Sequence, residues 1–127
     1  MGGNEEQAAE PTFDDLQTFE EGVTHHRPVT PTCPACGWQQ DLRQIDDGRW
    51  ILLEPKPLSV TVVPVDCRWF TTRDGRVVKQ HGTVPPANEC QMAHKLVCSS
   101  HPSPDRWSDI RVVLWAGNRA RDRLPYE

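Results

Sequence analysis

Two cysteines near residue 35 have the spacing of a metal-binding turn. Cys33 and Cys36 are separated by two residues and are followed by Gly37. Two intervening residues allow one tight turn to present both sulfurs to a single ion, and the glycine lets the backbone N–H groups point at those sulfurs. This pair supplies half of a tetrahedral zinc site, so the remaining ligands must come from elsewhere in the chain.

The second dense group of candidate ligands lies far downstream and comprises Cys90, His94 and Cys98. These three residues compete for two positions. A continuous helix over 90–98 would separate Cys90 from Cys98 by about 12 Å along its axis, which is too far for one tetrahedral ion. Either the segment is not a single helix or His94 takes one of the positions. We rank Cys90 with Cys98 first, His94 with Cys98 second, and Cys90 with His94 last.

The Cys-Pro-x-Cys spacing also occurs in disulfide oxidoreductases. That chemistry needs a strand before the motif and a helix after it, whereas the segment before Cys33 looks disordered and Gly37-Trp38 does not open a good helix. Zinc binding is therefore favoured over redox chemistry. Cys67 is expected to be a small buried hydrophobic residue. Four histidines are expected to lie in loops rather than to bind metal: His25, His26, His81 and His101.

Motifs that would make a zinc ion catalytic are absent from the sequence. There is no HExxH, no deaminase pattern of His-x-Glu with Pro-Cys-x-x-Cys, no glycine-rich phosphate loop and no Gly-x-Ser-x-Gly. We therefore expect a structural zinc ion and no enzymatic activity.

The segments that would position these ligands predict a mainly β chain with a C-terminal helix, which is a small α+β fold. Residues 33–79 predict an antiparallel β-meander with strands at 38–43, 49–54, 59–63, 68–72 and 76–79. Asp46-Asp47-Gly48 and Arg73-Asp74-Gly75 are the turn signals between them. The structural zinc would fasten the start of this sheet to the 90–98 segment.

The last segment, 104–124, predicts a helix that begins at Ser103-Pro104. One face of this helix would carry Trp107, Ile110, Val113 and Leu114. The helix ends at Gly117 or continues through Arg123, and a strand at 112–115 is an alternative.

Charge and composition divide the chain into three parts. Residues 1–22 carry seven acidic residues and no Lys or Arg, and the rest carries 14 basic and 11 acidic residues. We expect a disordered acidic arm at 1–30, a zinc-binding β-domain at 31–102, and a C-terminal helix and tail at 103–127. Hydrophobic residues make up only 36% of the chain, which predicts a small core that a metal would supplement. No secretory signal or membrane-spanning stretch is recognised, so we expect a cytoplasmic protein.

The order of the motifs resembles a family of small actinobacterial proteins of unknown function. The resemblance covers roughly residues 30–102 and rests on CPACG at 33–37, GRWILLEP at 48–55, RW at 68–69 and CQMAHKLVC at 90–98. It implies a bacterial, cytoplasmic protein in which the Cys/His group belongs together, and it supplies no activity. The first motif also resembles the knuckle of a zinc ribbon. It would be a variant, because the second CxxC knuckle is replaced by the segment from Cys90 to Cys98.

These observations favour a non-enzymatic zinc-binding module with a protein-interaction or regulatory role and an unknown protein partner. One alternative is a nucleic-acid-binding, zinc-ribbon-like protein that uses Arg49-Trp50, Arg68-Trp69 and Arg106-Trp107. The net charge of +3 outside the acidic segment is weak for that role. The other alternative is a thiol redox enzyme acting through Cys33 and Cys36. We expect neither membrane binding nor a small-molecule substrate.

Overall fold

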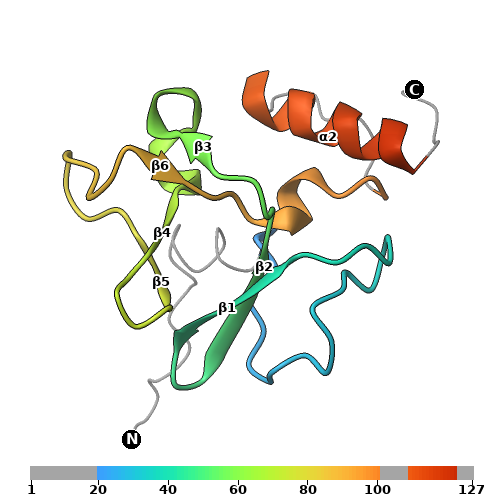
Figure 1. The fold of residues 1–127 in the computed structure, drawn as a ribbon, viewed down its shortest axis with the longest axis horizontal. Coiled ribbons are helices and arrows are strands. Elements are labelled where there is room, and N and C mark those ends of the chain that lie inside the picture. Colours follow the sequence, from blue (N-terminus) through green and yellow to red (C-terminus); the bar gives the residue numbers. More distant parts are fainter. Residues whose placement is uncertain (1–19, 101–108, 123–127) are drawn as a thin grey trace, which may run out of the picture.

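Short antiparallel strand pairs and one helix form the part of the chain that the computed structural model describes, residues 20–100 and 109–122 (Figure 1). The strands of these residues are β1 (Asp41–Asp46), β2 (Arg49–Leu53), β3 (Leu58–Ser59), β4 (Trp69–Thr71), β5 (Val77–Lys79) and β6 (Glu89–Cys90). The helical elements are three 3₁₀ turns, η2 (Val60–Val62), η3 (Val65–Cys67) and η4 (His94–Val97), and the α-helix α2 (Asp109–Arg121). The predicted small α+β class is confirmed.

Two of the predicted hairpins are present, because their turns are specified locally. Strands β1 and β2 pair with Leu42 opposite Leu52, and the Gly48 N–H donates to Asp46 Oδ1 at 3.1 Å in the turn. Strands β4 and β5 pair across a turn in which Gly75 has a φ of 87°, a conformation that favours glycine. Strand β1 begins three residues later than predicted, since the residues before it belong to the cysteine turn.

The predicted meander is wrong at residues 59–63. The strand pairs form three separate two-stranded sheets, β1-β2, β3-β6 and β4-β5. Strand β3 ends after Ser59 because the Ser59 side chain accepts a hydrogen bond from the Thr61 N–H and caps η2. Its partner is β6, which comes from the segment that also supplies the downstream candidate ligands. This pairing places the start of the segment 89–98 beside β3.

Residues 20–30, which we expected within the disordered arm, make defined contacts with the rest of the domain. Thr24 and Trp50 exchange two backbone hydrogen bonds of 2.9 Å, which extends the edge of β2. Glu21 is buried and pairs with Lys79 at 2.7 Å, and the Trp69 indole N–H donates to the same carboxylate oxygen at 3.3 Å. The rest of the expected arm, residues 1–19, lies outside the described residues.

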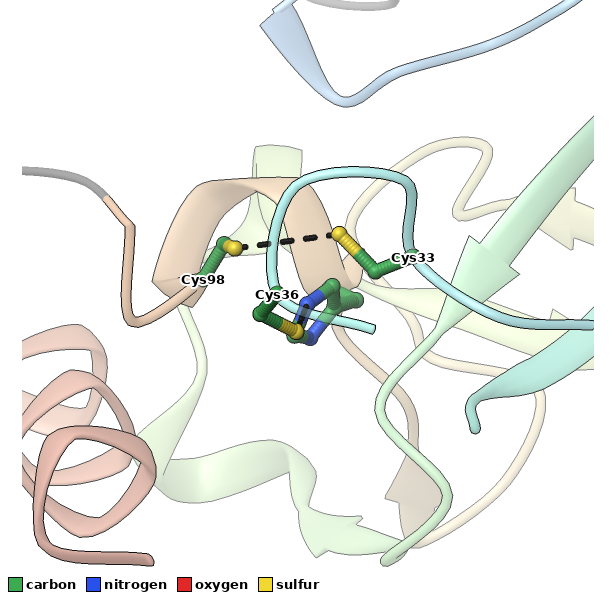
Figure 2. Close-up of side chains that lie close together, drawn as sticks. Cys33, Cys36 and Cys98 are labelled. Atoms are coloured by element: carbon green, nitrogen blue, oxygen red, sulfur yellow. Dashed lines mark hydrogen bonds between the residues drawn. The ribbon is translucent and has the colours of Figure 1, made fainter. Parts of the chain in front are cut away.

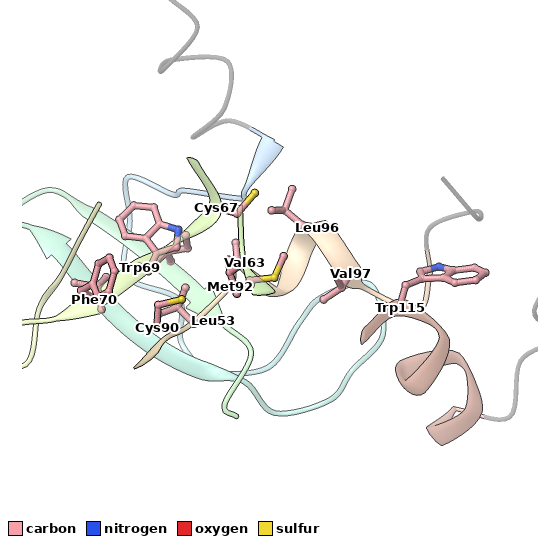
Figure 3. Close-up of a cluster of buried hydrophobic side chains, with 13 residues drawn as sticks. Leu53, Val63, Cys67, Trp69, Phe70, Cys90, Met92, Leu96, Val97 and Trp115 are labelled. Carbon is pink, nitrogen blue, oxygen red and sulfur yellow. The ribbon is translucent and has the colours of Figure 1, made fainter. Parts of the chain in front are cut away.

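The core runs between the strand pairs and reaches helix α2, as Figure 3 shows. Its buried side chains include Leu53, Val63, Cys67, Trp69, Phe70, Cys90, Met92, Leu96, Val97 and Trp115. Burial of Cys67 agrees with its expected role as a small hydrophobic residue. No helix within the described residues combines the length and the apolar character that crossing a membrane requires.

Helix α2 continues through Gly117 to Arg121, so an end at Gly117 and a strand at 112–115 are both wrong. The side chains that it buries are Trp115 and Asn118, and Ile110 and Leu114 pack at the edge of the core. Val113 is 63% exposed, so the predicted inner face was misplaced at that position. The predicted helix start at Ser103-Pro104, and Trp107, lie outside the described residues.

Candidate metal centre

Four predicted ligands from the two distant groups converge in the structure. The sulfurs of Cys33, Cys36 and Cys98 and a ring nitrogen of His94 all lie within 4.8 Å of one another. Figure 2 shows Cys33 and Cys36 on one loop and Cys98 on the facing segment. The Cys33 and Cys98 sulfurs lie 3.7 Å apart. The Cys36 Sγ lies 3.4 Å from His94 Nε2.

Two of these separations agree with those expected around a tetrahedral zinc ion. Zinc–sulfur bonds of about 2.3 Å and zinc–nitrogen bonds of about 2.0–2.1 Å place two sulfurs about 3.8 Å apart and a sulfur and a nitrogen about 3.5 Å apart. The two contacts above, 3.7 and 3.4 Å, agree with both values. The cluster could therefore hold a metal ion with only small adjustments of the side chains.

The first half of the centre is a tight turn. The Gly37 N–H donates to the Cys33 carbonyl at 2.7 Å, and the Cys33 N–H donates to the Trp38 carbonyl at 3.0 Å. Gly37 closes the turn with a φ of 80°, and the Ala35 N–H donates to the Cys33 sulfur at 3.4 Å. The chain then continues into strand β1. The motif is therefore followed by a strand and not by the helix that thiol oxidoreductases place there.

The second half changes conformation between its candidate ligands. Residues 90–98 are not one helix: Cys90 ends strand β6, and the 3₁₀ turn η4 begins at His94 and is capped by Cys98. Because β6 pairs with β3, Cys90 lies opposite Leu58 and its side chain joins the hydrophobic core. The geometry thus reverses our ranking of Cys90 with Cys98 ahead of His94 with Cys98. Cys90 lies outside the cluster and His94 lies inside it.

A buried carboxylate orients the histidine. Glu54 directly follows strand β2, and its Oε2 lies 2.6 Å from His94 Nδ1. The Asn118 side-chain amide donates to the same oxygen at 3.3 Å and to the Val97 carbonyl at 2.9 Å. When Nδ1–H donates to Glu54, Nε2 keeps its lone pair and faces the sulfurs. This carboxylate–histidine arrangement is the one commonly found behind metal-bound imidazoles.

Sequence reasoning missed Glu54 and Asn118. An acidic residue directly after the apolar run 50–53 was an available signal for Glu54, because a charge at the end of a buried strand needs a partner. Asn118 gave no signal, because an amide on a helix carries no motif. Predicted loop residues His25, His26 and His81 are outside the cluster, and His101 lies outside the described residues.

Proton affinities distinguish Cys98 from Cys67, the buried thiol outside the cluster. Burial opposes ionisation of Cys98, but hydrogen bonds with His94 and Ser100 and the charge of His94 lower its pKa to about 6. Burial also opposes protonation of His94, but its hydrogen bonds to Cys98 and Glu54 and the charge of Glu54 raise its pKa to about 11. In contrast, burial and two nearby carboxylates raise the pKa of Cys67 to about 11. The thiol of Cys98 is therefore more readily ionised than that of Cys67, and the thiolate is the form that binds metals.

Comparison with known proteins places the chain at the level of a family. Neither the curated proteins nor the solved structures contain a match to this chain. A family model does match, over residues 15–124, and this span includes all four clustered residues together with Glu54 and Asn118. The chain belongs to the family of unknown function DUF6083.

Proposed function

We propose that Cys33, Cys36, His94 and Cys98 bind one zinc ion and that this ion has a structural role. The contact between His94 Nδ1 and Glu54 carries the proposal, because it presents Nε2 to the cysteine sulfurs, and the Cys36 sulfur lies 3.4 Å from it. A cluster of three thiols and one imidazole is a donor set that zinc prefers.

The shape of the centre favours a structural over a catalytic ion. Four protein ligands complete a tetrahedron and leave no position for water or substrate. Cys33, His94 and Cys98 are at most 7% exposed. The ion would join the turn at 33–36 to η4, and Asn118 would link the same centre to helix α2. Such an ion stabilises a small domain by fastening segments that have few other contacts.

We further propose that the zinc-stabilised domain is a non-enzymatic interaction or regulatory module. A pocket of about 490 Å³ adjoins the centre, and its lining includes Cys33 and Cys98 together with the apolar side chains of Pro28, Val29 and Ile51. Val29 is fully exposed at this site. An apolar concavity with an exposed hydrophobic side chain is suited to receiving a side chain of a partner protein.

Contacts of the arginines give less support to the nucleic-acid alternative. Arg49 pairs with Asp46 at 2.9 Å. Arg68 donates to the Val63 carbonyl and to Gln80, both at 2.8 Å. Side chains that are already engaged within the domain contribute less to phosphate binding than free cations do. The third arginine–tryptophan pair, Arg106-Trp107, lies outside the described residues.

Metal analysis of the purified native protein tests the zinc proposal. We expect one zinc per chain, and we expect Cys33→Ser and His94→Ala to lose it. Cys67→Ala is the matched control, because it removes a buried thiol outside the cluster. Replacement of zinc by cobalt should give the strong sulfur-to-cobalt absorption of a site with several thiolates. A native protein without metal, or one that keeps its metal in His94→Ala, would contradict the proposal.

A further inference from the structure

The four proposed ligands differ in their exposure to solvent. Cys33, His94 and Cys98 are buried, with 7%, 1% and 2% of their surface exposed, whereas Cys36 is only half-buried. A reagent that removes the metal or attacks a thiolate must reach a ligand atom first. Cys36 is therefore the most exposed of the four ligands, and the pocket described above reaches Cys33 and Cys98 from another side.

One side chain contacts this ligand, and a second packs against the first. The Arg121 guanidinium, from the last residue of α2, places Nη2 3.8 Å from the Cys36 sulfur. The same guanidinium lies 4.7 Å from the centroid of the Trp38 ring, which is the distance of a cation–π contact. Trp38 follows the cysteine turn directly and is 47% exposed, so it serves as a platform on the solvent side of the site.

Further contacts hold Arg121 in this position. Its Nε and Nη2 donate to the two carboxylate oxygens of Asp122 at 2.8 and 3.1 Å. Asp122 in turn accepts a hydrogen bond from the Ser99 hydroxyl, one residue after Cys98. The cover over Cys36 is thus attached to both halves of the centre.

Charge gives Arg121 a second effect on Cys36. Three thiolates and one neutral imidazole around a zinc ion leave a net charge of about −1 on the centre. Arg121 is a cation in contact with one of the ligand sulfurs. A guanidinium beside a thiolate stabilises its negative charge, which lowers its nucleophilicity.

We propose that Arg121 and Trp38 form a cap over Cys36 that sets the rate at which the metal leaves the centre and the rate at which Cys36 reacts. This inference rests on the proposed zinc site and adds a control of its exchange. Metal exchange and thiol modification then begin at Cys36, and displacement of Arg121 by a competing anion or by a binding partner opens the site.

Transfer of zinc to an excess of EDTA, followed as a first-order rate, tests the cap. In Arg121→Ala we expect the rate to rise about fivefold, the equivalent of the ~1 kcal/mol between two unit charges about 4 Å apart in water. Trp38→Ala should also raise the rate while leaving the charge and the helix unchanged. Iodoacetamide should label Cys36 first in each variant, as located by peptide mass spectrometry.

Arg119→Ala is the matched control. Arg119 is on the same helix and carries the same charge, but it donates to the Ser99 carbonyl and lies over Trp115. The rate of zinc transfer from Arg119→Ala to EDTA should equal that of the wild type. Equal acceleration in Arg119→Ala and Arg121→Ala would mean a general loosening of α2 and would overturn the cap, as would unchanged rates in Arg121→Ala and Trp38→Ala. Metal content measured beforehand separates the two proposals: a wild type without metal contradicts the zinc site itself, whereas unchanged rates in fully loaded variants contradict only the cap.

Discussion

Replacement of Glu54 by glutamine or alanine should weaken zinc binding in graded steps. In the structure Glu54 Oε2 accepts from His94 Nδ1 at 2.6 Å, and both side chains are at least nine-tenths buried. A hydrogen bond to a charged group contributes about 1.5–3 kcal/mol, and loss of an outer partner of a metal-bound histidine lowers metal affinity about 10- to 100-fold. Glutamine keeps a neutral acceptor, so Glu54→Gln should cost about tenfold. Alanine leaves the buried Nδ1–H without an acceptor, so Glu54→Ala should approach about 100-fold.

Competition against a chromophoric chelator at fixed pH measures these affinities. Glu89→Gln is the control, since Glu89 is exposed on β6 and undergoes the same chemical change away from the centre. The cobalt-substituted variants should keep the sulfur-to-cobalt absorption, because Glu54 orients a ligand and is not one itself. If Glu54→Ala binds zinc as tightly as the wild type, Glu54 does not position His94 and the reasoning from the 2.6 Å contact is refuted.

Three further predictions follow from described contacts. Zinc affinity should rise with pH through the neutral range, because zinc must displace a proton from His94, whose pKa is about 11, and one from Cys36, whose pKa is raised by burial. Calorimetry in buffers of different ionisation enthalpy should detect the released protons. An affinity that does not change with pH would contradict this prediction. Gly37→Ala should lower stability by about 1–2 kcal/mol in urea unfolding of the loaded protein, from the cost of a positive φ alone, since no atom lies within 4 Å of an added Cβ. Cys90→Ala should keep its zinc and lose only about 1 kcal/mol of stability, and loss of the metal in this variant would show that our placement of Cys90 in the core is wrong.

The hairpins could be predicted from sequence because their signals are local. Asp46-Asp47-Gly48 and Arg73-Asp74-Gly75 specify turns through residues that are adjacent in the chain. The pairing of β3 with β6 could not be predicted, because two-residue strands have no periodicity and their partners are about 30 positions apart. The strand predicted at 59–63 is wrong for a local reason. A single side-chain cap at Ser59 outweighs the β-branched composition of this segment.

The candidate centre was predicted in outline but not in detail. Spacing alone made Cys33 and Cys36 candidate ligands and left Cys90, His94 and Cys98 to compete for the other two positions. The choice between Cys90 and His94 depended on where residues 90–98 change from strand to 3₁₀ turn, and that point is fixed by the pairing of β6. Arg121 lies 85 positions from Cys36, and only the packing of α2 brings the two together.

Helix α2 also illustrates how tertiary contacts override a helical pattern. The predicted inner face included Val113, which is exposed. The side of α2 that is buried in the structure includes the polar Asn118, whose amide donates to Glu54 and to the Val97 carbonyl. A face chosen by hydrophobicity alone does not anticipate a helix that is held by hydrogen bonds to a polar centre.

The separation of the ligands along the chain has a consequence for protein synthesis. Cys36 precedes its neighbour His94 by 58 positions, and Cys33 precedes Cys98 by 65. At the usual 5–20 residues per second, the first thiol pair leaves the ribosome roughly 3–12 s before its partners exist. During that interval the nascent chain presents only two ligands, which hold zinc weakly and are open to oxidation or to the wrong metal. The centre is therefore completed late, after β1 to β6 have been made. For the proposed zinc site to form, Cys33 and Cys36 must stay reduced until the second half of the chain has been made.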